Sequence, residues 1–288
     1  MPVRFSVSNS LEIAADVDGQ WDGPVVVLLH GGGQTRHAWG GTTRALGDAG
    51  FLAITLDLRG HGDSDWAPDG DYSMGSYVRD LRAVLADLQR PAALVGASLG
   101  GLAALLVAGE APEVECTAVV LVDVTPRMDP DGREKIAGFM RSRPDGFASL
   151  EEAADAVAAF LPHRPRPSDV SGLAKNLRLE PDGRYHWHWD PAFMDASRLG
   201  QDVERPERFE RAAAAVTAPM VLVRGGISEI VSEDGVRAFR RVAPGAEYVD
   251  VPNASHMVAG DRNDIFTAAV VEFLTRRLSS THHGTHYR

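Results

Sequence analysis

Short runs of β-branched and aliphatic residues recur along the chain, each bounded by Gly, Pro or Asp. Runs that stay apolar without alternation are typical of strands buried on both faces of a sheet. Two more polar runs, Arg4–Ser8 and Leu11–Val17, come first. The apolar runs that follow them are Val25–Leu29, Phe51–Leu56, Ala92–Val95, Ala118–Val122, Met220–Val223 and Ala246–Val251.

Segments with helical periodicity lie between these runs. In Tyr77–Leu88 apolar side chains recur at intervals of three and four residues, and Ser98–Gly109 is rich in Ala and Leu. Both patterns are typical of helices that pack one face against a core. Because strands and helices alternate, the sequence predicts an α/β fold with a mostly parallel sheet covered by helices on both faces.

The alternation stops after Val124 and resumes only at Met220. This stretch is far longer than an ordinary connection, and it contains helical patterns at Arg133–Arg141 and Leu150–Phe160. It leaves and re-enters the core at strand ends, where α/β sheets bind ligands, so it is expected to cover a pocket. The predicted organisation is a core of residues 1–125 and 216–278, a helical cap of residues 126–215 and a flexible tail of residues 279–288.

The charge balance narrows the range of partners. Lys and Arg number 29 against 40 Asp and Glu, a formal net charge of −11, which disfavours nucleic acid and anionic membranes as partners. The single Cys116 excludes a disulfide framework and a cysteine-rich zinc site. No apolar stretch approaches the roughly 18 residues of a membrane span. We therefore expect a cytoplasmic protein, and we interpret His282, His283 and His286 as part of a frayed terminus, with no metal bound.

The strongest chemical signal is Gly96-Ala97-Ser98-Leu99-Gly100, which lies between a predicted strand and a predicted helix. A serine on such a sharp turn exposes its hydroxyl at the strand end, and the flanking glycines allow the backbone to turn. The N-terminus of the following helix also favours developing negative charge. We predict that Ser98 is a nucleophile.

A serine hydroxyl needs a base within hydrogen-bond reach and an acid that orients the base. His256 follows the last predicted strand, on the same edge of the sheet as Ser98, and is the expected base. Two carboxylates could hold it. Glu229, in the loop after Met220–Val223, is the favoured acid, and it satisfies the chain order of nucleophile, acid and base. Asp123, at the end of the preceding strand, is the alternative.

Acyl transfer also needs hydrogen-bond donors for the oxyanion. The loop His30-Gly31-Gly32-Gly33 follows the strand Val25–Leu29 and can present backbone N–H groups without side chains in the way. We expect the amides of Gly32 and Leu99 to form the oxyanion hole.

These motifs, together with Asp57-Leu58-Arg59-Gly60-His61-Gly62-Asp63-Ser64, resemble the α/β-hydrolase superfamily over nearly the whole chain. The resemblance implies an eight-stranded, mostly parallel sheet, a cap inserted after the sixth strand, and a serine, acid and histidine triad that needs no cofactor. It places Ser98 as nucleophile, His256 as base and Glu229 in the acid position, where Asp is usual. It also implies that the Asp57–Ser64 loop is architectural.

The expected substrate is a small carboxylic ester, cleaved through an acyl-enzyme on Ser98. In the cap, the candidates to line the acyl pocket are the aromatic residues Tyr185, Trp187, Trp189 and Phe193, and Arg127 and Arg133 are available for a carboxylate. Together they would suit the monoester of an aromatic dicarboxylic acid. In the alternative interpretation the tryptophans form the core of the cap.

Other functions stay open on the same motifs. A carbon–carbon bond hydrolase or a cofactor-free perhydrolase or haloperoxidase would use the same triad, and a ligand sensor could keep the hydrolase fold. The sequence also leaves a homodimer open.

Overall fold

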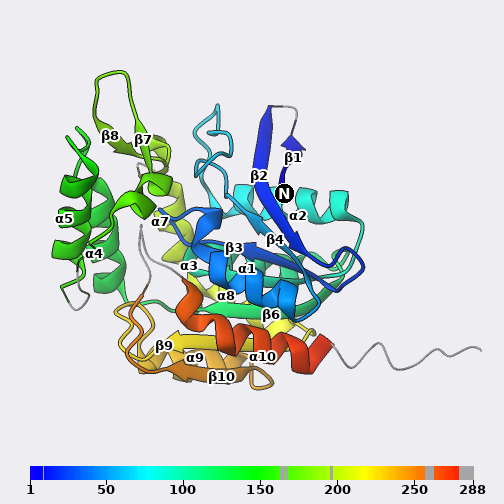
Figure 1. Ribbon diagram of the computed structural model, residues 1–288. Helices are drawn as coiled ribbons and strands as arrows, with labels where there is room; N and C mark the ends of the chain where they lie inside the picture. Colours follow the sequence, from blue (N-terminus) through cyan, green and yellow to red (C-terminus); the bar gives the residue numbers. More distant parts are fainter. Residues whose placement is uncertain (9, 163–165, 167, 195–196, 257–262, 279–288) are drawn as a thin grey trace, which may run out of the picture.

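The computed structural model describes the chain apart from residues 9, 163–165, 167, 195–196, 257–262 and 279–288. In the described part, eight strands form one sheet in the order β1-β2-β4-β3-β5-β6-β9-β10 (Figure 1). β1 and β2 pair antiparallel, β2 pairs antiparallel with β4, and the remaining neighbours are parallel. The strands are Pro2–Ser8 (β1), Leu11–Gly19 (β2), Val25–Leu29 (β3), Leu52–Leu56 (β4), Ala92–Ala97 (β5), Cys116–Val122 (β6), Met220–Gly225 (β9) and Glu247–Val251 (β10).

Helices cover both faces of this sheet, so the predicted α/β class is confirmed. Successive strand residues point to opposite faces, and in β3 Val26 and Leu28 belong to one core cluster while Val25, Val27 and Leu29 belong to the other. One face packs against Gly40–Asp48 (α1) and Thr267–Leu278 (α10). The other face packs against Met74–Leu88 (α2), Ser98–Glu110 (α3), Pro206–Ala215 (α8) and Glu233–Val242 (α9).

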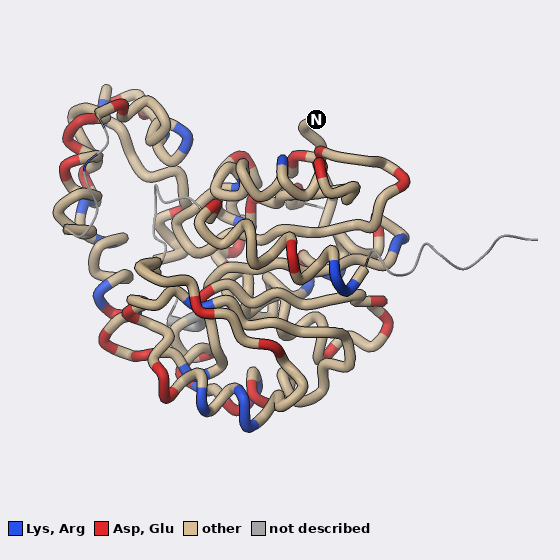
Figure 2. The backbone as a smooth tube through the Cα atoms, turned by 60° about the horizontal axis from the view of Figure 1, so that its bottom comes forward, with Lys and Arg blue, Asp and Glu red and all other residues tan. Residues whose placement is uncertain are grey.

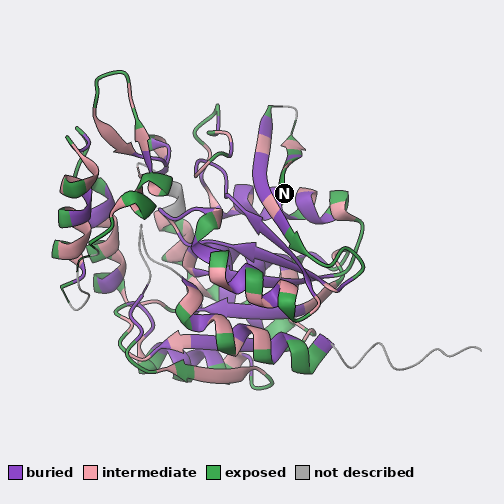
Figure 3. Ribbon diagram, viewed as in Figure 1, coloured by how far each residue is buried: buried purple, intermediate pink, exposed green. Residues whose placement is uncertain are grey.

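The burial of the strands follows their position in the sheet (Figure 3). All five residues of β3 and of β4 are buried, as their unbroken apolar sequences predict. β10 differs from the prediction of a strand buried on both faces, because it lies at the edge of the sheet and most of its residues are half-buried. Cys116, at the start of β6, is also half-buried, and burial raises the pKa of its thiol to about 11.

Most of the segment between β6 and β9 forms a lobe beside the sheet (Figure 1). The two predicted cap helices are present, and a two-stranded antiparallel sheet follows them. The last helix of the segment, α8, packs on the core helix α3, where a Cβ on Gly109 would come within 2.3 Å of the Ala212 carbonyl oxygen. The other elements are Pro130–Arg141 (α4), Leu150–Phe160 (α5), Ser171–Asn176 (η2), Leu177–Leu179 (β7), Tyr185–Trp187 (β8), Pro191–Met194 (α6) and Ser197–Val203 (α7).

Charged positions lie mostly on the helices and loops that surround the sheet (Figure 2). Asp and Glu occur on both the core and the cap, with Lys and Arg among them. Within the described ranges, no helix combines the length and apolarity that crossing a bilayer requires.

Candidate active site

Ser98 lies on the sharp turn that its motif predicts, at the junction of β5 and α3. Its φ of +45° is a left-handed conformation that a side chain rarely adopts. The turn brings backbones so close that a Cβ on Gly96 would lie 2.4 Å from the Gly100 carbonyl oxygen, and a Cβ on Gly100 would lie 2.6 Å from the His30 carbonyl oxygen. Only glycine fits at these two positions, so the motif fixes the strained turn that presents the Ser98 hydroxyl.

His256 and Asp123 form a buried pair beside this turn. His256 Nδ1 lies 2.7 Å from Asp123 Oδ2, and the two side chains are 4% and 1% exposed. Because the carboxylate accepts the Nδ1 proton, Nε2 is left as the proton acceptor of the ring. The structure thus selects the carboxylate that the sequence ranked second.

Glu229 does not contact His256, which corrects the favoured assignment of the acid. It is exposed, and its Oε1 accepts from Lys135 Nζ at 3.0 Å. Its loop contributes Ser228 instead, whose hydroxyl donates to Asp123 Oδ2 at 2.7 Å, while the Gly225 amide donates to Oδ1 at 2.9 Å. Sequence reasoning missed Ser228, although it adjoins the residue that was singled out.

The glycine loop after β3 lies against the nucleophile. A Cβ on Gly31 would lie 3.3 Å from Ser98 Cβ, and a Cβ on Gly32 would lie 4.0 Å from Leu99 Cδ2. Leu99 is in the first turn of α3, where backbone N–H groups have no acceptor within the helix. The expected oxyanion donors, Gly32 and Leu99, therefore lie close together beside Ser98.

Three buried imidazoles hold this loop in place. His30 accepts from the Leu58 amide at Nε2 and donates from Nδ1 to the Gly31 carbonyl oxygen. His61 Nε2 accepts from the Gly33 amide. His188, from the cap, accepts from the Gly62 amide at Nδ1, and its Nε2 donates to the Gly33 carbonyl oxygen at 3.3 Å.

Burial makes all three of these rings neutral. It lowers the pKa of His30 to about 4 and that of His61 to about 3, and it places the pKa of His188 well below the usual value. The proximity of the rings to one another contributes further to the low pKa of His61 and His188. Each imidazole can then serve as donor on one nitrogen and acceptor on the other, as the loop requires.

A pocket of about 520 Å³ opens beside Ser98. The two expected oxyanion residues and His256 line it together with Ser98. Most of the other lining residues are apolar and come from α3, the start of the cap and the segment around α6 and α7. They are Leu102, Met128, Pro130, Ile136, Ala137, Met140, Phe193, Met194 and Val203, and Ile230 joins them from the loop after β9.

Trp187 and Trp189 do not line this pocket, which corrects their assignment as substrate-binding residues. Their rings stack on each other at a centroid distance of 4.9 Å, and Trp187 also meets Phe139 and Phe147 edge to face. They form the core of the cap, as the alternative interpretation of the sequence held. Phe193, another of the aromatic residues that the sequence offered for the acyl site, does line the pocket.

Truncating either indole is therefore expected to destabilise the protein without changing its acyl preference. Trp187→Ala and Trp189→Ala, made singly, should each lower the free energy of unfolding by about 3–5 kcal/mol. The relative rates across a series of acyl groups should stay as in the wild type. Denaturant unfolding and ester kinetics measure the two effects, and a changed acyl preference would return these residues to the pocket.

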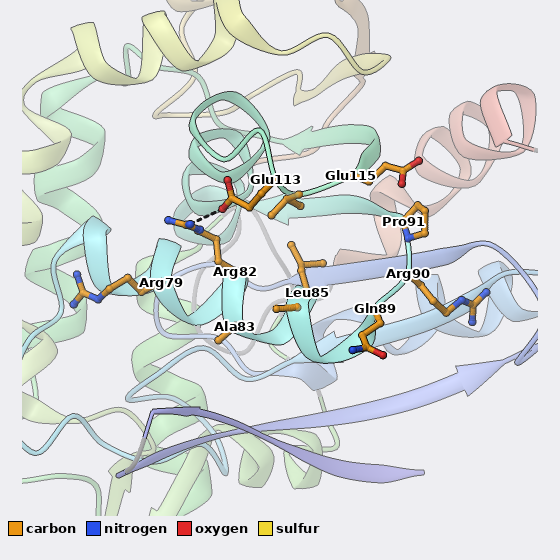
Figure 4. Close-up of a pocket in the computed structure, with 11 residues that line it drawn as sticks. Arg79, Arg82, Ala83, Leu85, Gln89, Arg90, Pro91, Glu113 and Glu115 are labelled. Carbon is orange, nitrogen blue, oxygen red and sulfur yellow. Dashed lines mark ion pairs between the residues drawn. The ribbon is translucent and has the colours of Figure 1, made fainter.

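A second hollow of about 520 Å³ lies at the opposite end of the parallel strands, where β5 and β6 begin (Figure 4). Its arginines have protein partners: Arg82 pairs with Glu113, Arg79 with Asp71, and Arg90 donates to the Trp21 and Gly23 carbonyl oxygens. Because the two hollows have equal volume, volume does not identify the active site. Of the two, the first is lined by Ser98 and His256.

Metal binding was not expected, and the three tail histidines lie outside the described residues. Among the residues that are described, no three His, Cys, Asp or Glu side chains gather as ligands would.

Comparison with known proteins agrees with this geometry. The profile of the alpha/beta hydrolase fold family matches residues 24–262. The chain is 34% identical to esterase Rv0045c of Mycobacterium tuberculosis, over 84% of this chain and 80% of that one. It is 30% identical to the sn-1-specific diacylglycerol lipase ABHD11 of Mus musculus, over 90% and 83% of the two chains.

Among solved structures, E-2-(acetamidomethylene)succinate hydrolase superposes with a TM-score of 0.82 at 23% identity, covering 97% of this chain and 99% of that one. At 23% identity, this similarity is evidence for the fold alone. With the fold, the motifs and a sequence match over most of its length in agreement, the chain belongs to the α/β-hydrolase family and is one of its hydrolases.

Proposed function

We propose that the protein is a carboxylic ester hydrolase that works through an acyl-enzyme on Ser98. One observation carries the proposal: Ser98, on its strained turn, lines the same pocket as His256, whose Nδ1 is held by the buried carboxylate of Asp123. This arrangement supplies a nucleophile, a base of fixed tautomer and an acid that stabilises the protonated base.

The proposed reaction has two halves. His256 Nε2 takes the Ser98 proton as Oγ attacks the ester carbonyl carbon, and the amides of Gly32 and Leu99 donate to the oxyanion that forms. The intermediate collapses to the acyl-enzyme when His256 protonates the departing alcohol. Water then attacks the acyl group, with His256 again as base, and releases the acid and the free serine.

The names of the relatives support ester chemistry. One is called an esterase and the other a diacylglycerol lipase, and both match this chain over more than four fifths of its length. The largely apolar wall of the pocket suits an aliphatic acyl group of small to medium size.

The proposal is tested by turnover and covalent labelling. Wild type and Ser98→Ala are assayed with p-nitrophenyl acetate, butyrate and hexanoate, and are treated with a serine-directed p-nitrophenyl phosphonate for intact-mass and peptide analysis. The wild type should hydrolyse esters and gain one phosphonyl group on Ser98, whereas Ser98→Ala should do neither. Ser76→Ala, which removes a buried hydroxyl of α2 outside the pocket, should behave as wild type.

Ester turnover that persists in Ser98→Ala would contradict the proposed nucleophile. A wild type labelled on Ser98 but inactive on every ester would contradict ester hydrolysis, and it would favour carbon–carbon bond cleavage or perhydrolysis on the same residues.

A further inference from the structure

One face of the cap helix α4 forms a wall of the pocket. Arg133, Ile136, Ala137 and Met140 all line it, and their spacing of three, four and seven residues places them on one side of the helix. Arg133 thus shares its side of the helix with three apolar residues that line the pocket.

The start of α4 is fixed against the loop beside the His256 and Asp123 pair. The Asp129 amide donates to the Ile230 carbonyl oxygen at 2.8 Å, and the Asp129 side chain caps the helix by accepting from the Gly132 amide at 3.0 Å. A Cβ on Gly132 would lie 2.2 Å from the Glu229 carbonyl oxygen. Because Arg133 is the next residue, its position relative to the active site is set by backbone contacts.

Arg133 has no protein partner within the described ranges. Its Nε is buried and makes no hydrogen bond, and an unsatisfied buried donor is unfavourable. The neighbouring cations are paired: Lys135 with Glu229, Arg127 with Glu210, and Arg141, the other arginine that lines the pocket, with Glu134. Arg127, the other arginine that the sequence offered for a carboxylate, does not line the pocket.

Three carboxylates also line the pocket: Asp131, Glu134 and Glu204. All three are exposed to solvent, and Glu134 is already paired with Arg141. Asp131 and Glu134 lie two residues before and one residue after Arg133 on the helix, spacings at which side chains do not face each other. None of the three forms an ion pair with Arg133 in the described structure.

We propose that Arg133 binds a carboxylate at the far end of the substrate's acyl group. The apolar residues between the two ends would contact the methylene chain, so the inferred substrate is a monoester of an aliphatic dicarboxylic acid. The guanidinium carries N–H donors in a planar fork, an arrangement that matches the two oxygens of a carboxylate. The identity of the acyl group rests on the proposed ester hydrolysis, whereas the anion subsite itself does not.

Two esters that differ only in the terminal group test the subsite. Mono-p-nitrophenyl adipate carries a carboxylate where p-nitrophenyl hexanoate carries a methyl group. Arg133→Gln should lower kcat/KM for the adipate ester by about 10- to 100-fold, mainly through KM, and should leave the hexanoate within about twofold. Arg127→Gln, which removes an arginine outside the pocket, should change neither. An equal loss on both esters, or no loss on the adipate, would overturn the proposal.

A binding measurement separates this inference from the proposed function. Calorimetric titration of Ser98→Ala with mono-p-nitrophenyl adipate needs no turnover, and the affinity should fall about 10- to 100-fold in Ser98→Ala/Arg133→Gln. If the wild type cleaves neither ester, the proposed function fails while the titration still decides the subsite. Equal affinity of the two proteins for the adipate ester would reject Arg133 as the anion ligand.

Discussion

Replacing Asp123 with Asn is expected to lower kcat for ester hydrolysis by about 10,000-fold with little change in KM. The substitution keeps the shape of the side chain but offers an amide where His256 Nδ1 now meets a carboxylate oxygen at 2.7 Å. The imidazole would then be held in the wrong tautomer, and its protonated form would lose the adjacent negative charge. Steady-state kinetics on p-nitrophenyl butyrate measure the effect.

Glu229→Gln is the matched control for this prediction. Glu229 is exposed and paired with Lys135, and exposed ion pairs contribute little, so kcat should stay within about twofold of the wild type. Thermal unfolding of both variants should show folded proteins. A larger loss in Glu229→Gln than in Asp123→Asn would reverse the assignment of the acid.

The sequence pattern alone could not identify the acid that contacts His256. Both Asp123 and Glu229 follow strands that end at the same edge of the sheet and lie between Ser98 and His256 in the chain, and the family resemblance favoured Glu229. Which carboxylate reaches His256 depends on side-chain direction: Asp123 adopts a left-handed φ of +49° at the end of β6, whereas Glu229 lies beyond the turn that Ser228 makes. These dihedral angles follow from packing between loops and leave no mark on the periodicity.

The central strands were predictable because burial on both faces leaves an unbroken apolar run. The bounds of β3 coincide with the predicted run, and the other predicted strands shift by a few residues at most. The roles of Trp187 and Trp189 were harder to predict, because an indole can pack in a core or line a substrate pocket. Their stacking and the position of Arg133 depend on how the cap helices pack, which is a tertiary property.

Acidification is expected to destabilise the fold through the buried histidines. The folded pKa values of about 4 for His30 and about 3 for His61 lie below the ordinary 6.5, so from pH 6.5 downward the unfolded chain binds protons that the folded chain excludes. Stability is then lost as the pH falls from 6.5 toward the folded pKa values. The loss amounts to about 3 kcal/mol for His30 and about 5 kcal/mol for His61. The buried Asp57 and Asp80, whose pKa values are raised by desolvation, act in the opposite direction.

Because Asp57 and Asp80 also titrate, the contribution of His61 is isolated by comparing the wild type with a variant that lacks this ring. Denaturant unfolding of wild type and His61→Gln is measured at intervals between pH 4 and 6.5. His61→Gln removes one titrating ring, so its free energy of unfolding should depend on pH less steeply than that of the wild type, by about 1.4 kcal/mol per pH unit near pH 5. Leu274→Ala destabilises the core from α10 without removing a titrating group and should shift the wild-type curve downward in parallel. Parallel curves for His61→Gln and the wild type would contradict a neutral His61. A shallower pH dependence in His61→Gln would mean that the folded protein keeps the His61 ring neutral. The neutral ring accepts a hydrogen bond from the Gly33 amide, so the stability of the fold would be linked to the geometry of the glycine loop after β3.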